Sequence, residues 1–141
     1  MTNVTTRPRS AETPTGERTM SNADIAMDFM TLASSGLAAE AWERYGAPDF
    51  RHHNPYFAED GPTLVAAMDE NARQNPDKAY EVKRTISEGP FVAVHGYVRH
   101  KPGDRGAALV HIFRIEDGRI RELWDIGQEV PADSPNRSGM F

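Results

Sequence analysis

The chain contains no cysteine among its 141 residues. This absence excludes disulfide bonds, thiolate metal ligands and catalysis by a cysteine nucleophile. The sequence also has no apolar run near the roughly 20 residues that a membrane-spanning helix needs. Its first residues lack the apolar stretch of a secretory signal. We therefore expect a cytoplasmic protein without a membrane partner.

Positive charge is scarce as well, because 16 Lys and Arg residues stand against 21 Asp and Glu residues, for a formal net charge of -5. Proteins that bind nucleic acids usually gather their basic residues into a stripe. The arginines of this chain show no such clustering, so we expect no nucleic-acid partner. The sequence also lacks a Walker loop, a dinucleotide-binding glycine fingerprint and the Gly-x-Ser-x-Gly elbow of hydrolases.

The first 20 residues differ in composition from the rest of the chain. Residues 1–20 are rich in Thr, Pro, Arg, Ser and Glu, and they hold too few apolar groups to offset the entropy lost on ordering. We expect a disordered tail over residues 1–20 and one folded domain over residues 21–141, a usual length for a domain. An ordered arm on a partner subunit is the alternative for the tail, and Met20 is an alternative start.

Apolar residues recur at helical spacing in the first half of the domain. Ser21 or Asn22 can cap a first helix, whose apolar residues follow at i, i+4 and i+7. Residues 37–45 predict a second helix, and residues 62–75 predict a third helix that begins with proline. The segment 49–55 is too polar for a core strand, so we predict a connector at the mouth of a cleft.

After Pro76 the hydrophobic pattern alternates with a period of two, which is typical of strands. Turn residues separate four strand candidates, at residues 79–87, 91–100, 107–115 and 120–128. Helices followed by consecutive strands predict an α+β fold, in which helices cover one face of a curved antiparallel sheet. The other face is apolar too, and we expect a second copy of the chain to cover it.

The last hairpin brings two titratable residues onto one face. A three-residue loop at residues 116–118 pairs Ile115 with Arg119. In that register His111 and Asp125 lie diagonal to each other on the same face. A two-residue loop would change the parity of the pairing and separate them. The predicted pair therefore depends on the type of turn.

The face that this register defines is otherwise apolar, with Leu109, His111, Phe113, Leu123 and Asp125 as its members. A carboxylate in apolar surroundings keeps its proton to higher pH, which suits a general acid or base. Asp125 is thus the first catalytic candidate, with His111 to orient it, stabilise its charge or share its proton. Phe113 and Leu123 are expected to contact an apolar substrate. An Asp satisfied by backbone amides or an arginine at a sheet edge is the alternative.

Two histidines and an asparagine follow one another in the predicted connector. His53 and Asn54 are candidates to point into the cavity and to donate hydrogen bonds to a substrate carbonyl or enolate. A turn at Asn54 and Pro55, with His52 exposed at the surface, is the alternative. Adjacent histidines in an extended segment diverge, so we predict no metal site and no cofactor.

Three segments resemble a known family: 50–55 (FRHHNP), 92–98 (VAVHGYV) and 111–131 (HIFRIEDGRIRELWDIGQEVP). Through them the chain resembles the SnoaL-like polyketide cyclases, within the nuclear-transport-factor-2-like superfamily, over roughly residues 22–141. The resemblance implies a cone-shaped α+β fold with about three helices, whose sheet wraps around an apolar pocket. It also implies a homodimer formed through the outer face of the sheet.

In the polyketide cyclases an aspartate on the last strand is the acid and base of an intramolecular aldol closure, with a histidine nearby on the preceding strand. The resemblance implies these roles for Asp125 and His111, and it places His53 and Asn54 at the pocket. We therefore expect an enzyme without a cofactor that cyclises or isomerises an apolar carbonyl compound. A non-catalytic pocket for a small ligand, or a dimeric scaffold of the same fold, is the alternative.

Overall fold

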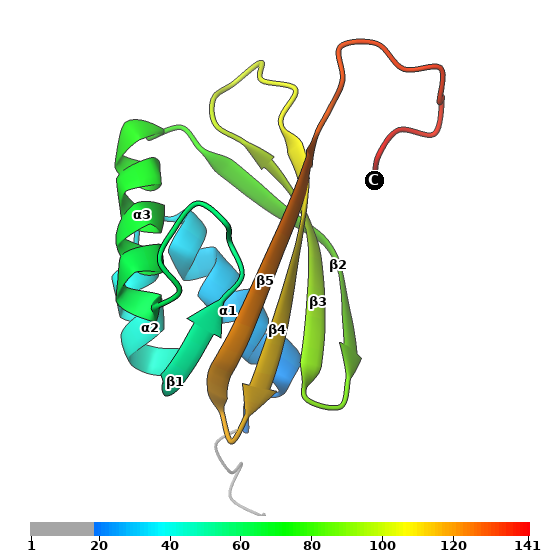
Figure 1. Cartoon of the computed structure of the whole chain (residues 1–141). Coiled ribbons are helices and arrows are strands. Elements are labelled where there is room, and N and C mark those ends of the chain that lie inside the picture. The colour runs from blue at the N-terminus through cyan, green and yellow to red at the C-terminus, as the bar shows by residue number, and fades with distance from the viewer. Residues whose placement is uncertain (1–18) are drawn as a thin grey trace, which may run out of the picture.

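A computed structural model describes residues 19–141 of the chain. The predicted disordered tail of residues 1–20 lies outside the described residues, apart from Thr19 and Met20. The fold is α+β, as predicted (Figure 1). Its elements are α1 (Asn22–Ser34), α2 (Ala38–Tyr45), β1 (Gly46–His52), α3 (Gly61–Gln74), β2 (Ala79–Glu88), β3 (Phe91–Arg99), β4 (Ala107–Glu116) and β5 (Arg119–Glu129).

Side-chain caps determine where two of the helices begin. The Ser21 hydroxyl accepts a hydrogen bond from the Asp24 backbone N–H at 3.1 Å, and the Asp24 carboxylate accepts one from the Ser21 N–H at 3.0 Å. This capping box satisfies backbone donors that the first turn of α1 leaves free. Asp60 caps α3 in the same way through the Thr63 N–H, with Pro62 in the first turn. The predicted start of each helix is confirmed to within one residue.

Residues 46–52 form a strand, which corrects the prediction of a connector over residues 49–55. β1 lies parallel to β5 at the edge of the sheet, so the sheet is mixed and has one more strand than the sequence predicted. The polarity of β1 has a structural reason, because its outward side chains bind charged partners on the neighbouring strand. Arg51 pairs with Glu122, and Asp49 pairs with Arg121.

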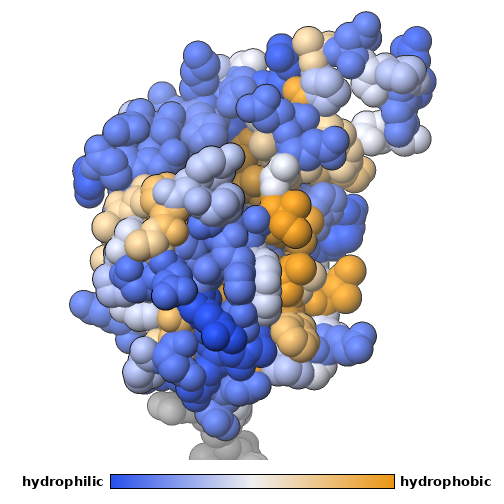
Figure 2. Space-filling model, in the orientation of Figure 1, coloured by the Kyte–Doolittle hydropathy of each residue, from blue (hydrophilic) through white to orange (hydrophobic). Residues whose placement is uncertain are grey.

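The helices and the sheet form two layers. All three helices lie on one side of an open, curved sheet with the strand order β1-β5-β4-β3-β2 (Figure 1). Among residues 19–141 no helix covers the other side, which we call the outer face. Figure 2 shows hydrophobic side chains gathered over the strands. On this outer face Ile86 and Ile126 are 65% and 61% exposed.

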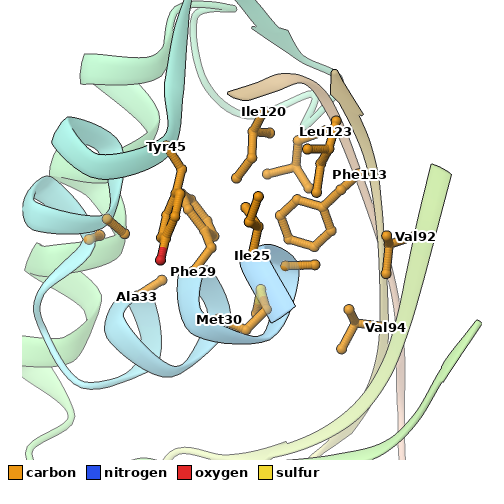
Figure 3. Close-up of a cluster of buried hydrophobic side chains, with 14 of the residues drawn as sticks. Ile25, Phe29, Met30, Ala33, Tyr45, Val92, Val94, Phe113, Ile120 and Leu123 are labelled. Atoms are coloured by element: carbon orange, nitrogen blue, oxygen red, sulfur yellow. The ribbon is translucent and has the colours of Figure 1, made fainter. Parts of the chain in front are cut away.

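The hydrophobic core lies between the inner face of the sheet and the helices (Figure 3). Phe29 of α1 meets Phe113 of β4 edge to face, with ring centroids 5.7 Å apart. Val92 and Leu123 are at most 1% exposed beside them. Burial of such apolar surface is the main favourable contribution to folding. The core therefore anchors α1 to the centre of the sheet and fixes the inner face.

The hairpin between β4 and β5 has a two-residue turn, which corrects the predicted three-residue loop. Asp117 and Gly118 occupy the turn with φ of 53° and 73°, and Glu116 pairs with Arg119. Two successive positive φ angles are typical of the type I′ turn, whose twist matches that of the strands. The Asp-Gly dipeptide fits this turn because glycine adopts positive φ without strain.

A β-bulge in β5 compensates for the shorter turn. The register of β4 and β5 shifts just after the turn, and the pairing skips Arg121. A bulge adds one residue to one strand and so changes which side the later residues face. As a result His111 lies directly opposite Asp125, and both share the inner face. The predicted shared face is confirmed, although the turn that was expected to produce it is not present.

Candidate functional site

A cavity of about 210 Å³ lies between the helices and the inner face of the sheet. This volume is below the ~300–1,000 Å³ of pockets that hold drug-sized ligands, so the cavity suits a small molecule. Its walls are mainly apolar and carry a few polar side chains. The lining residues are Met30, Ala33, Ser34, Asn54, Phe57, Leu64, Ala67, Met68, Asn71, Lys78, Tyr80, Val98, Leu109, His111 and Asp125.

Asp125 is the carboxylate of the cavity. It stands opposite His111 in the ladder of β4 and β5 and is partly exposed to the cavity. The side-chain amide of Asn54 donates a hydrogen bond of 3.0 Å to its Oδ2 atom. Among residues 19–141 no Lys, Arg or His forms an ion pair with this carboxylate. The structure thus brings Asp125, His111 and Asn54 together, as the sequence predicted.

His111 is buried beside Asp125 and is neutral at physiological pH. Burial lowers the pKa of His111 to about 4, because a charged imidazole loses its hydration. The negative charge of Asp125 opposes this change, and the positive charge of Lys78 adds to it. The Nδ1 atom of His111 is buried and has no hydrogen-bond partner within the described part of the chain. A neutral imidazole leaves the negative charge of Asp125 available.

A second polar group, which the sequence reasoning missed, lines the cavity from the start of β2 and the residue before it. Lys78 donates a hydrogen bond of 2.9 Å to the side-chain oxygen of Asn71, and burial lowers the pKa of Lys78. Burial raises the pKa of Tyr80 to about 12, and its buried hydroxyl has no partner among residues 19–141. The available signal was the alternation of Lys78, Tyr80 and Val82 on one face of a strand. A lysine before a strand is usually solvated, which hid this signal.

Gly96 of β3 makes room for Tyr80. A Cβ atom at Gly96 would overlap the ring and hydroxyl of Tyr80, so the ring lies flat over this glycine. A glycine inside a strand often marks such a close approach. Gly96 thereby helps to place the Tyr80 hydroxyl at the cavity wall.

His53 does not line the cavity, which corrects its predicted position. Its Nε2 atom donates a hydrogen bond of 2.6 Å to Glu122, and its ring stacks on Trp124 with centroids 4.9 Å apart. Adjacent residues of an extended strand face opposite sides, so His53 points away from the side that His52 faces. His52 is buried and donates to the Ala58 carbonyl at 2.6 Å, so it is not the exposed residue of the alternative prediction.

Phe113 and Leu123 lie in the core and are not part of the cavity wall, which corrects their predicted contact with a substrate. The inner face is divided along the length of each strand. Residues near the β4–β5 turn pack against α1, whereas residues farther from it, such as His111 and Asp125, face the cavity. Alternation predicts which face of the sheet a residue points to. It does not predict whether the residue lies at the end packed against α1 or at the end that lines the cavity. Phe113 supports the ring of His111 at a centroid distance of 6.4 Å.

The part of the chain that the structure describes contains neither a helix that could cross a membrane nor a cluster of metal ligands. Within residues 19–141 none of the helices has the length and apolar character required to cross a membrane. In the same range no group of three or more His, Cys, Asp or Glu side chains is placed to hold a metal ion. What the cavity does offer is a carboxylate, a neutral imidazole, an ammonium group and a phenol in apolar surroundings. Such a set can bind a polar oxygen and transfer a proton.

Comparisons with known proteins agree with this architecture. A family model described as a SnoaL-like domain matches residues 26–123. The comparison with curated proteins gave no match.

Solved structures with the same fold come from several bacteria. The proposed polyketide cyclase IdmH of Streptomyces antibioticus has a TM-score of 0.64 and 18% identity, over 77% of this chain and 93% of that one. A proposed ketosteroid isomerase of Kribbella flavida has a TM-score of 0.63 and 21% identity, over 82% and 84%. An NTF2-like protein of unknown function from Cytophaga hutchinsonii has a TM-score of 0.63 and 18% identity, over 79% and 95%. At these identities the similarity shows the fold alone.

Proposed function

The chain belongs to the SnoaL-like domain family, and on that premise we propose that it is an enzyme that moves a proton on a small apolar carbonyl compound. The position of Asp125 carries this proposal. Its carboxylate faces an apolar cavity, is oriented by the Asn54 amide at 3.0 Å and stands opposite a neutral histidine. Such a carboxylate is a suitable general base, because no cation among residues 19–141 holds its charge in an ion pair.

The reaction begins when Asp125 removes a proton from the carbon next to the substrate carbonyl. The electrons of the broken C–H bond form an enolate, and Asp125 becomes a carboxylic acid. In an isomerisation this acid returns the proton to a different carbon. In an aldol closure the enolate carbon attacks a second carbonyl of the same molecule, and the acid protonates the new alkoxide. Both reactions balance without a cofactor.

Asn54 positions the base, and His111 sets the charge beside it. Asn54 donates a hydrogen bond to Oδ2, so the Oδ1 atom remains free to accept a proton. Because the pKa of His111 is about 4, the imidazole stays neutral near pH 7 and does not weaken the base by an adjacent positive charge. His111 thus acts on the base through its lack of charge, and it lines the cavity as a polar contact for the ligand.

The similar structures support the reaction class. Two of them are described as a proposed polyketide cyclase and a proposed ketosteroid isomerase. Aldol closure and double-bond isomerisation share a first step, the removal of an acidic proton next to a carbonyl. A cavity with one placed carboxylate is equipped for this shared step.

Binding of a small ligand without turnover is the second candidate function. One observation favours it, because Asp125 is partly exposed and not sealed from solvent. A base in a water-excluded site is a stronger catalyst than a solvated one. Within residues 19–141 Asp125 has no ion pair, and this favours catalysis instead, since a purely structural aspartate is usually paired.

Deuterium exchange on 2-tetralone, a bicyclic ketone with acidic protons next to its carbonyl, tests the proposal. In D₂O the wild type should speed deuterium incorporation, followed by proton NMR. Asp125→Asn should lower this rate by about 10²- to 10⁴-fold, the usual contribution of a general base. Asp133→Asn, an exposed change in the C-terminal segment, is the matched control. Equal rates for wild type and Asp125→Asn would contradict the proposal.

We also propose that the outer face of the sheet is covered by a second copy of the chain. Phe91, Ile86 and Ile126 are 43%, 65% and 61% exposed on this face. Large exposed apolar patches on a soluble protein usually mark an interaction surface. A two-fold dimer buries the same patch of both copies and is the commonest assembly of soluble proteins.

A further inference from the structure

The ammonium group of Lys78 lies at the cavity wall without a carboxylate partner among residues 19–141. Its hydrogen bond goes to the neutral side-chain oxygen of Asn71. Lys83 of β2, by contrast, pairs with Glu81 at 3.0 Å. A partly buried charge without a counter-ion is unfavourable, and proteins usually pair or solvate it. The position of Lys78 therefore calls for a negative partner that residues 19–141 do not supply.

Tyr80 lines the same cavity, and its buried hydroxyl also lacks a partner within the described residues. Lys78 and Tyr80 are two residues apart in an extended segment, so their side chains leave the backbone on one side, about 7 Å apart. A buried donor without an acceptor costs free energy that a ligand can recover by supplying the acceptor. Two such donors from one wall of the cavity favour a ligand group with two acceptor oxygens.

We propose that Lys78 and Tyr80 bind a carboxylate of the ligand, so that the cavity selects small apolar organic acids over neutral molecules of the same shape. This inference deepens the proposed function and rests on it only for the identification of the ligand as the substrate. One ammonium and one hydroxyl match a carboxylate better than a phosphate, which usually takes arginines or a helix N-terminus. Among residues 19–141 no arginine lines the cavity.

Asp125 and Lys78 hold different ends of the ligand. Asp125 lies on β5 and Lys78 precedes β2, and two strands separate β5 from β2 in the sheet. At ~4.8 Å between neighbouring strands, the two backbones are about 14 Å apart along the sheet. The bound carboxylate therefore lies beside Lys78 and away from the negative charge of Asp125. The ligand would carry its acid group at one end and its reacting carbon at the other.

Binding of 2-naphthoate and its neutral analogue 2-naphthamide, measured by calorimetry, tests the inference without any turnover. The wild type should bind the acid more tightly than the amide by roughly tenfold to a hundredfold, as expected for a charge-assisted hydrogen bond. Lys78→Met, which keeps most of the side-chain volume, should abolish this preference and leave the affinity for the amide unchanged. Tyr80→Phe should reduce the preference in part. Lys83→Met, at a lysine outside the cavity wall, is the matched control.

A second measurement follows the charge of Lys78 directly. The chain has three lysines, at positions 78, 83 and 101, so their Cε resonances can be assigned by substitution. Burial lowers the pKa of Lys78, and bound 2-naphthoate should raise it again. The other titratable groups that line the cavity are Tyr80, His111 and Asp125. Asp125→Asn should therefore be titrated in parallel, to separate the effect of the ligand from that of the nearby carboxylate.

Three results would overturn the inference: no binding of 2-naphthoate, equal affinity of the wild type for acid and amide, or a preference that persists in Lys78→Met. The experiments distinguish failure of this inference from failure of the proposed function. If Asp125→Asn leaves proton exchange unchanged while the preference for the acid is present, the proposed reaction fails and the binding site stands. If exchange depends on Asp125 and no preference exists, the reverse holds.

Discussion

His111 and Asp125 face each other directly across the ladder of β4 and β5. One is a buried imidazole that remains neutral, and the other is a carboxylate bound by an amide. A tight turn and a bulge lie between them in the sequence. The backbone hydrogen bonds of β4 and β5 place them opposite each other. The pair is therefore held by the sheet itself, which makes it more rigid than a pair carried on loops.

The stability of the protein should depend on pH through His111. In the folded state its pKa is about 4, below the ordinary value of 6.5, so the unfolded state binds more protons between these values. The stabilising contribution is complete above pH 6.5 and is lost as the pH falls toward 4. At ~1.36 kcal/mol per pH unit, the loss is on the order of 3 kcal/mol.

Urea unfolding at a series of pH values measures this effect. His111→Gln removes the titrating group, so the free energy of unfolding of this variant should change less between pH 6.5 and 4. His100→Gln, at an exposed histidine, should retain the pH dependence of the wild type. Identical pH dependence in His111→Gln and the wild type would contradict a buried neutral histidine.

Gly96→Ala should weaken the binding of 2-naphthoate by displacing Tyr80. The added methyl group overlaps the Tyr80 ring, which must turn away from the cavity wall. We expect affinity similar to that of Tyr80→Phe and a loss of about 1–3 kcal/mol in the free energy of unfolding, as for an overpacked core. Gly89→Ala is a useful contrast, since nothing lies near that site and only its positive φ of 55° opposes alanine. Unchanged binding in Gly96→Ala would show that the glycine does not place Tyr80.

His53→Ala should lower stability and leave proton exchange unchanged. Its hydrogen bond is the largest of the effects that hold the pKa of Glu122 below the usual value, and its ring covers Trp124. Because His53 is partly exposed, we expect a loss of about 1 kcal/mol in the free energy of unfolding. Chemical denaturation and the 2-tetralone exchange assay check the two parts. A fall in the exchange rate with unchanged stability would restore His53 as a candidate for substrate binding.

Ile126→Asp should convert the proposed dimer into a monomer. Ile126 is 61% exposed on the outer face, and an aspartate there would be buried without a partner in a dimer. Sedimentation equilibrium at micromolar concentration gives the mass directly. Leu37→Asp, at a residue 46% exposed beside α2, is the matched control and should leave the mass unchanged. A wild type that sediments as a monomer would refute the dimer.

Much of the fold could be predicted because each helix carries its own local signal. Ser21 and Asp60 mark helix starts through hydrogen bonds within one turn, and alternation marks the strands after Pro76. β1 escaped prediction because its charged residues are satisfied by Arg121 and Glu122, which are far away in sequence. Pairing with a distant strand leaves no local pattern to detect.

The candidate site was predicted only in part for the same reason. Asp125 and His111 share the site because strand alternation determines their face, and Asn54 joins them from the segment after β1. His53 was misplaced because the prediction treated a strand end as a loop, where neighbouring side chains can point to the same side. Lys78 was missed because its burial depends on α3, whose Asn71 accepts its hydrogen bond.

The bulge at Arg121 reverses which face of the sheet each later residue of β5 points to. Ile120 and Leu123 are both buried although three positions separate them, a spacing that an uninterrupted strand would place on opposite faces. The two parts of the strand are thus in different phases, each regular in itself. An alignment with a relative whose hairpin is regular must open a one-residue gap at Arg121. Without that gap, the residue matched to Asp125 would come from the wrong side of the sheet.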